Sequence, residues 1–345
     1  MDKRVLIVGP NYFGYNESVE YAFKELGWAT EIIDYYDAFP KNIKNFLYYS
    51  LSPRLKIDYF YQAYKRQINE SILSFVKTKK PDLVLFIKGS YLEENTLREI
   101  NKETKTVLWM MDSVFRFQNT YKLIRNFDYR FMFEETDVAK LAEENVESYF
   151  LPMAADSNNY YPIPTDQKDI DVLFVGKLYP NRLELFDRLV KRFPKLNIKI
   201  YGKYTSLKKP DSFLKYHFSG INKYYTNEFV TPKELNTLYS QSKIALNIHH
   251  SQSQAGCNPR VFEILAAKTF QLVDEIPYIK DHFKGKDMLE TYETEQELFD
   301  KIEYYLNNSA ERERIAEKGY HHIIENHTFL KRVEFILHVM DSNKK

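Results

Sequence analysis

The sequence predicts an α/β protein with two Rossmann-like domains that face each other across a cleft. The chain has 345 residues, which is long for one domain and comfortable for two. Short β-rich runs alternate with amphipathic helical stretches, a pattern typical of βαβ units in a parallel sheet. The alternation stops at a proline-rich stretch and then starts again, which indicates a second domain of similar size.

The first half of the chain carries the first alternation. Its expected strands are 5–8, 30–33, 83–87, 106–110 and 130–133, and its expected helices are 17–26, 93–101 and 137–144. Between them, residues 39–80 form an insertion that we expect to be mostly helical. These elements predict a first Rossmann-like domain over residues 1–152.

The second alternation follows a break that contains Pro152, Pro162 and Pro164. We therefore expect a linker at 153–169 and a second Rossmann-like domain at 170–325. The expected strands are 172–175, 198–201, 244–248 and 270–273, and the expected helices are 184–193, 232–242, 259–268, 295–306 and 310–325. A last helix at 330–340 carries an apolar stripe that needs a partner, so residues 326–345 are expected to pack back on the first domain.

The amino-acid composition narrows the classes of protein to which the chain can belong. Lys and Arg total 49 and Asp and Glu total 48, which leaves no general electrostatic footprint for nucleic acid. The single cysteine, Cys257, excludes an internal disulfide and fits a reducing cytoplasm. No apolar run approaches the ~20 residues of a membrane span, and no signal peptide is expected at the N-terminus. Tyrosine is dense between residues 35 and 64, which fits either a core or a surface for sugar rings or another protein.

Residues 247–268 carry the most chemical information. A strand ends near Ile248, a polar loop follows, and Asn258 and Pro259 are suited to begin a helix. A helix N-terminus suits an anion, and Arg260 adds a cation whose fork geometry matches phosphate. Glu263 lies on the same helical face and can accept hydrogen bonds from a ribose diol. The segment predicts a nucleoside diphosphate site, although Arg260 and Glu263 would also form a simple i,i+3 ion pair.

The run Asn-Pro-Arg-Val-Phe-Glu-Ile-Leu-Ala, after Ala-Leu-Asn-Ile-His, resembles the CgeB-like, spore-maturation branch of glycosyltransferases in the GT-B superfamily. The resemblance is specific over about residues 170–275. It implies a hexosyltransferase-like enzyme whose donor is held mainly by the C-terminal domain and whose hydroxyl acceptor is held mainly by the N-terminal one. It also implies no obligate metal and no cofactor, because the nucleotide sugar is a substrate.

One departure from the family pattern affects the expected chemistry. Related retaining transferases carry Glu-x7-Glu, in which Glu263 would be the second glutamate and Ala255 stands in the place of the first. The resemblance therefore carries over a ribose-binding role for Glu263 but no role for the first glutamate.

A second donor-side segment follows the expected strand 172–175. Gly176 makes the turn, and in GT-B enzymes the basic residues of this turn often contact the donor diphosphate, so Lys177 and Arg182 are candidates by resemblance. They could equally be ordinary surface cations. Tyr201, at the end of the next strand, could flank the base.

On the acceptor side, strand ends point to a few residues. The turn after the first strand lacks a dinucleotide GxGxxG pattern, which argues against a nicotinamide enzyme. The residues expected to line the cleft are Asn11, Gly14, Lys88 and His249. In each domain these residues could also form turns without a ligand contact.

Asp112 is the candidate general base, because it follows the strand 106–110 at the expected cleft rim. It could instead cap the following segment or pair with Arg116. Glu134, Glu135 and His249 are next in line.

The sequence leaves two other functions open. One is a GT-B-fold sugar-nucleotide epimerase, and the other is a non-catalytic nucleotide-sugar-binding or scaffold protein. No Cys/His spacing supports a metal site, and the adjacent pairs His249-His250 and His321-His322 cannot each point to one site. The nucleotide, sugar, acceptor, stereochemical outcome and oligomeric state are not determined by the sequence.

Overall fold

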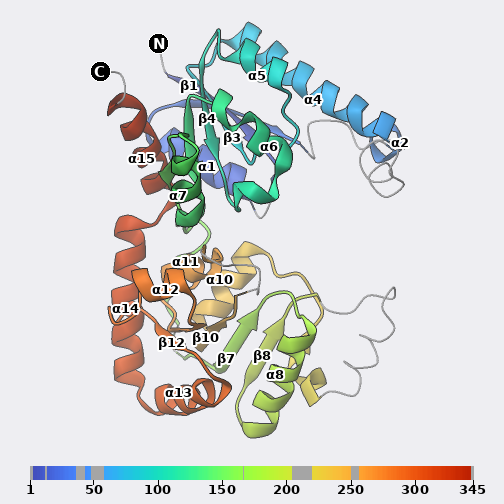
Figure 1. Ribbon diagram of the computed structural model, residues 1–345. Helices are drawn as coiled ribbons and strands as arrows, with labels where there is room; N and C mark the ends of the chain where they lie inside the picture. Colours follow the sequence, from blue (N-terminus) through green and yellow to red (C-terminus); the bar gives the residue numbers. More distant parts are fainter. Residues whose placement is uncertain are drawn as a thin grey trace. The chain divides into compact units, whose positions relative to one another are not determined.

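The structure is a computed structural model that describes residues 3–11, 14–35, 43–47, 58–165, 167–203, 220–249 and 256–342. The chain divides into two compact units. Unit 1 comprises Met1–Met153 together with Phe329–Lys345, and unit 2 comprises Ala154–Thr328. Each unit is built around a sheet with helices packed against it (Figure 1).

The described strands of unit 1 form one parallel sheet in the order β2-β1-β3-β4-β5-β6. They are β1 (Arg4–Gly9), β2 (Ala29–Asp34), β3 (Leu83–Ile87), β4 (Lys105–Trp109), β5 (Tyr129–Met132) and β6 (Tyr149–Phe150). The short edge strand β6 was not expected from the sequence. Because β1 is followed by β2 on one side and flanked by β3 on the other, the strand order reverses between β1 and β3, where open α/β sheets bind ligands.

Central strands of this sheet are buried on both faces. Val5, Leu6, Ile7 and Val8 are each 0% exposed, which explains why β1 reads as an unbroken apolar run. The last residue of the strand, Gly9, lies against Ile87 so closely that an added Cβ would come within 2.6 Å of the Ile87 Cβ. Glycine is thus required where the ends of β1 and β3 meet.

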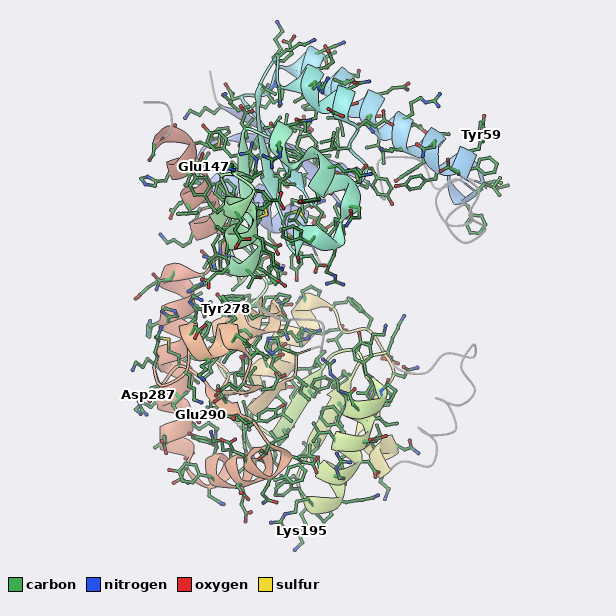
Figure 2. The ribbon with its side chains drawn as sticks, in the orientation of Figure 1. Tyr59, Glu147, Lys195, Tyr278, Asp287 and Glu290 are labelled. Atoms are coloured by element: carbon green, nitrogen blue, oxygen red, sulfur yellow. The ribbon has the colours of Figure 1, made fainter. Side chains whose placement is uncertain are left out.

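Helices cover both faces of the unit 1 sheet. They are α1 (Tyr15–Glu25), α2 (Ile43–Phe46), α4 (Asp58–Lys79), α5 (Glu94–Ile100), α6 (Gln118–Leu123), α7 (Glu135–Glu143) and α15 (Phe329–Ser342), with short 3-10 turns at Val114–Arg116 and Ile124–Asn126. The insertion expected at 39–80 contains α2 and α4. In Figure 1, α4 extends beyond the edge of the sheet, and Tyr59 near its N-terminal end is exposed (Figure 2).

The described part of the tyrosine-rich segment contributes to the core. Tyr35 and Tyr64 are buried, and both rings pack edge-on against Tyr91 at centroid distances of 5.1 and 5.5 Å. The Tyr64 hydroxyl also donates to the Tyr35 carbonyl. Most of residues 35–57 lie outside the described residues.

The C-terminal helix α15 belongs to unit 1 and packs against α1. Val333, Ile336 and Met340 bury the apolar stripe seen in the sequence. The guanidinium of Arg332 donates to the carbonyls of Pro152 and Met153, each at 2.9 Å. These bonds hold the start of α15 to the end of the N-terminal stretch of unit 1.

The described strands of unit 2 form a second parallel sheet, in the order β12-β11-β10-β7-β8-β9. They are β7 (Ile170–Val175), β8 (Ile198–Tyr201), β9 (Tyr225–Thr226), β10 (Ser242–Asn247), β11 (Gln271–Asp274) and β12 (Glu290–Tyr292). Here the strand order reverses between β7 and β10. In open α/β sheets, ligands bind beside the carboxyl ends of the two strands at such a point.

Helices flank this sheet as well. They are α8 (Pro180–Arg192), α10 (Pro232–Ser240), α11 (Arg260–Ala266), α12 (Pro277–His282), α13 (Glu295–Asn307) and α14 (Ser309–Asn326), with a 3-10 turn at Gly220–Lys223. Thr231 and Glu234 form a capping box that begins α10. None of the helices in the described ranges is long and apolar enough to cross a membrane.

The stretch predicted as a linker lies largely within unit 2. Ala155 pairs with Thr328 in a parallel bridge, and the Tyr161 N–H donates to Asn236 Oδ1 at 3.2 Å. The Ile163 N–H donates to Ser240 Oγ at 3.3 Å. The prolines here interrupt helix and strand, but hydrogen bonds still tie residues 154–165 to the second unit.

Candidate functional site

The carboxyl ends of β7 and β8 meet through two glycines. The Gly176 N–H donates to the Tyr201 carbonyl at 2.9 Å. Gly202 has φ +141°, and an added Cβ there would lie 2.0 Å from the Gly176 oxygen. Of the predicted donor residues, Gly176 and Tyr201 are thus adjacent, and their backbones set the shape of this edge.

Arg182 lies at the point where the strand order reverses. Arg182 is only 7% exposed, and its guanidinium donates to the Lys177 carbonyl and the Ile248 carbonyl, both at 2.7 Å. The cation also lies 5.1 Å from the centroid of the Tyr179 ring. Burial lowers the pKa of this arginine. Arg182 is therefore not an ordinary surface cation, because it joins the loop after β7 to the residue after β10.

Lys177 differs from Arg182 although the two are neighbours in the turn. Its side chain is exposed, and its Nζ lies 5.2 Å from the centroid of the Tyr179 ring. Its ammonium group is therefore open to solvent, whereas its carbonyl is bound by Arg182.

Asn258 does not cap the helix as expected. The helix α11 begins at Arg260, after Pro259, and no side chain caps it. Instead, the amides of Asn247 and Asn258 exchange hydrogen bonds of 3.1 and 2.9 Å. Asn247 is 1% exposed, so this pair gives a buried amide its partner and fixes the start of α11 to the end of β10.

Arg260 and Glu263 form the i,i+3 pair that the sequence allowed, with 3.5 Å between Nη1 and Oε2. The two side chains differ in exposure, at 29% for Arg260 and 8% for Glu263. Burial raises the pKa of Glu263, the charge of Arg260 opposes that rise, and the charge of Asp156 adds to it. A buried carboxyl group of raised pKa is suited to hydrogen bonding with hydroxyl groups, while Arg260 presents a partly exposed cation beside it.

His249 belongs to the donor-side group rather than to the acceptor side. It follows β10 in unit 2, and its Nδ1 lies 2.8 Å from Oδ1 of Asp274, the last residue of β11. The sequence analysis missed Asp274. The sequence does contain a pattern that points to Asp274. A carboxylate directly follows the expected strand 270–273, and the expected strand 244–248 ends next to His249.

In unit 1, Asp112 is held by two cations. Its Oδ1 accepts from Arg116 Nη1 at 2.7 Å, and its Oδ2 lies 3.4 Å from Lys88 Nζ. Lys88 has φ +64° and is followed by Gly89 at φ +61°, so the backbone turns sharply after β3. The pairing with Arg116 that the sequence allowed is therefore present, and it brings the predicted residues Lys88 and Asp112 together.

Glu134 lies near Asp112 at the end of β5. Burial and the charge of Asp137 raise the pKa of Glu134. Asp137, which the sequence analysis missed, is buried and accepts from Ser113 Oγ at 2.9 Å and from the Val114 N–H at 2.8 Å. It holds the turn that carries Asp112. Glu135 begins α7 and is exposed.

The turn after β1 contains Asn11 and Gly14. The Asn11 N–H donates to Asp34 Oδ1 at 3.2 Å, and its side-chain amide donates to Glu17 Oε1 at 2.6 Å. Gly14 has φ +80° and accepts the first helical bond of α1 from the Ser18 N–H at 3.0 Å. The contacts of both residues are those of a turn, while residues 12 and 13 lie outside the described residues.

Metal ligation has no geometric support in the described ranges, where no three His, Cys, Asp or Glu side chains are grouped to hold an ion. Cys257, the single cysteine of the sequence, is buried and 1% exposed. Ala255 and His250 lie outside the described residues.

Comparison with known proteins agrees with this arrangement. A family model described as glycosyl transferase-like matches residues 182–338, a range that contains Arg182, His249, Arg260 and Glu263. The spore protein CgeB of Bacillus subtilis (strain 168) is 22% identical over 283 residues, which cover 75% of this chain and 83% of that protein.

Solved structures match over nearly the whole chain. Sucrose-phosphate synthase from Thermosynechococcus elongatus has a TM-score of 0.67 at 9% identity and covers 99% of this chain and 100% of its own. Anabaena HepE, solved with UDP and glucose, has a TM-score of 0.65 at 12% identity, with the same coverage of 99% and 100%. The predicted GT-B fold is confirmed. The family match and the curated relative, together with the shared GT-B fold, support a CgeB-like glycosyltransferase.

Proposed function

We propose that the protein transfers a sugar from a nucleoside-diphosphate donor to a hydroxyl acceptor without a metal or a cofactor. The observation that carries the proposal is the pairing of Arg260 with the buried carboxyl group of Glu263 at the carboxyl edge of the unit 2 sheet. Ligands of open α/β sheets bind at this edge, next to the point where the strand order reverses. HepE, which shares the fold, was solved with UDP and glucose, and this supports a nucleotide donor.

In the proposed complex, each donor-side residue has a distinct role. The Glu263 carboxyl binds the ribose diol, and Arg260 binds the diphosphate through charge-assisted hydrogen bonds. Lys177 adds an exposed cation for the same phosphates. Arg260 and Lys177 stabilise the charge that develops on the departing diphosphate, which supplies the electrostatic help that a metal would otherwise give.

We assign the acceptor to unit 1. In the reaction the bond from the anomeric carbon to the diphosphate breaks and a bond from that carbon to the acceptor oxygen forms. The acceptor proton passes to a carboxylate, for which Asp112 is our candidate. The absence of a glutamate at Ala255 favours an inverting transfer. The lone buried thiol of Cys257 fits an enzyme of the cytoplasm.

Binding measurements test the donor assignment. The protein is titrated with nucleoside diphosphates, nucleosides and nucleotide sugars in the presence of EDTA, and binding is followed by the rise in melting temperature. Arg260→Ala should weaken diphosphate binding about 10- to 100-fold and leave nucleoside binding nearly unchanged, because a charge-assisted contact is lost. Glu263→Ala should weaken both ligands.

A matched control distinguishes these effects from general damage. Arg188 on α8 forms an exposed ion pair with Glu295 at the start of α13, with 2.6 Å between Nη2 and Oε2, so Arg188→Ala removes an ion-paired arginine away from the proposed site. Equal and small effects of all three substitutions on every ligand would mean that Arg260 and Glu263 only stabilise the fold. Loss of binding in EDTA alone would contradict the metal-free mechanism.

A further inference from the structure

The side chain of His249 is buried but only half hydrogen-bonded. It is 1% exposed, and its Nδ1 lies 2.8 Å from Asp274 Oδ1. The same carboxylate also accepts the His249 backbone N–H, at 2.8 Å to Oδ1 and 3.0 Å to Oδ2. The other ring nitrogen, Nε2, is buried without a hydrogen-bond partner among the described residues.

The Asp274 contact determines which ring nitrogen carries the proton. An ionised carboxylate only accepts hydrogen bonds, so the Nδ1 that faces it must carry the proton. In the neutral imidazole, Nε2 then has a lone pair and no proton. A buried acceptor without a donor costs free energy, so an unpaired buried group in a folded protein calls for an explanation, and a bound ligand is one.

The surroundings of His249 show what kind of partner this is. The residue before it, Ile248, accepts from Arg182, and Asn247 is paired with Asn258 just before Arg260. The end of β10, just before His249, is therefore hydrogen-bonded both to Arg182 and to Asn258. Phosphate oxygens only accept hydrogen bonds, so they are poor partners for an unprotonated nitrogen, whereas a hydroxyl group can donate to it.

We propose that His249 Nε2 accepts a hydrogen bond from a hydroxyl group of the bound donor, and that Asp274 is the positioning residue that holds the proton of the neutral imidazole on Nδ1. The inference rests on the proposed donor site of unit 2. The hydroxyl group belongs either to the ribose or to the transferred sugar, and the experiment separates these two sources.

Three substitutions test the roles of the two side chains. His249→Phe keeps the ring but removes the acceptor, and His249→Gln keeps a polar group near the position of Nε2. Asp274→Asn retains an oxygen for the backbone N–H of His249, while its NH₂ group donates to Nδ1 and moves the imidazole proton to Nε2. The control is His321→Phe, because His321 is a surface imidazole paired with Glu317 at 3.0 Å in the same unit.

The ligand series identifies the hydroxyl group. UDP, GDP, ADP and CDP are screened first, and the tightest binder is compared with its 2′-deoxy and 3′-deoxy forms, its glucose conjugate and the deoxy-glucose forms of that conjugate. His249→Phe and Asp274→Asn should each weaken the hydroxylated ligand about tenfold. Neither substitution should weaken binding of the one analogue that lacks the bonded hydroxyl group. The affinity lost through the substitution and the affinity lost through removal of the hydroxyl group are therefore non-additive. His249→Gln should restore part of the affinity.

Nitrogen-15 NMR of the imidazole gives a reading that a purely structural role would not change. The wild-type His249 should show a protonated Nδ1 and an unprotonated Nε2, and Asp274→Asn should reverse them. Normal donor affinity in His249→Phe, or equal weakening of every analogue, would overturn the inference and leave the proposed function standing. If the wild-type protein binds none of the nucleotides or conjugates, the proposed function and this inference both fail.

Discussion

Arg182→Met should destabilise unit 2 and leave the intrinsic contacts to the donor largely intact. The resemblance made Arg182 a candidate ligand of the diphosphate, with an ordinary surface cation as the equal alternative. In the structure its guanidinium is buried and donates to the carbonyls of Lys177 and Ile248, both at 2.7 Å. These bonds join the loop after β7 to the residue after β10. We therefore expect a stability effect to dominate.

The size of the effect follows from these contacts. A hydrogen bond to a charged group contributes about 1.5–3 kcal/mol, and the two carbonyls lose their donor when methionine replaces arginine. Burying the guanidinium costs part of that energy, so the net loss should be about 3 kcal/mol. For a domain of this size, each kcal/mol shifts the melting temperature by about 2–4 °C, which predicts a fall of about 6–12 °C.

Differential scanning fluorimetry without a nucleoside diphosphate measures the loss of stability, and the same measurement with the nucleotide measures the effect on donor binding. Arg188→Met is the control, because its exposed pair with Glu295 should contribute about 1 kcal/mol or less. Arg182→Lys should fall between the two, since an ammonium group cannot reach both carbonyls with the geometry of a guanidinium. If Arg182→Met melts like the wild type but loses nucleotide affinity, Arg182 is a ligand of the donor and the structural reasoning is wrong.

Three other predictions concern different parts of the molecule. Asp112→Asn should lower turnover by orders of magnitude with donor affinity nearly unchanged, and near-normal turnover would move the base to Glu134. Gly202→Ala should destabilise the protein by more than Gly285→Ala, since both have positive φ but only Gly202 faces a backbone oxygen, 2.0 Å from the added Cβ. Burial raises the pKa of Glu263, so ionisation of this carboxyl group favours the unfolded chain. The wild-type protein should therefore lose stability as pH rises above about 4.3, the ordinary pKa of a glutamate. Glu263→Gln should therefore gain melting temperature relative to wild type between pH 4 and 7, and a constant difference across that range would contradict the assigned environment.

Local sequence patterns were sufficient to predict the longer strands but not the short edge strands β6, β9 and β12. Val5 to Val8 form a continuous apolar run because β1 is buried on both faces, and the same reasoning located β3 and β10. The Arg260–Glu263 pair was also predictable, because i,i+3 neighbours meet on any helix. In each case the structural cause lies within a few residues of the pattern.

Contacts between distant residues could not be predicted in the same way. Arg182 is bonded to Ile248, 66 positions away, and His249 is bonded to Asp274, 25 positions away. The sequence shows that each residue follows or precedes a strand, but the order of strands in the sheet decides which of them meet. His249 was therefore assigned to the acceptor side, and Asp274 was missed altogether.

The contacts of unit 2 separate the groups that hold the site from the groups available to a ligand. The Gly176–Gly202 backbone contact, the Arg182 bonds to two carbonyls and the Asn247–Asn258 pair all join one loop to another. Arg260, the Glu263 carboxyl and His249 Nε2 are carried on the elements so joined. Rigid support lowers the ordering cost of binding, so a ligand should gain affinity from groups that are already in place. Substitutions in the first set should therefore lower the melting temperature of the free protein. Substitutions in the second set should chiefly lower the ligand-induced shift, and Glu263→Gln should in addition raise the melting temperature of the free protein as predicted above. A variant of the second set that lowers the free melting temperature as much as Arg182→Met does would show that this division is wrong.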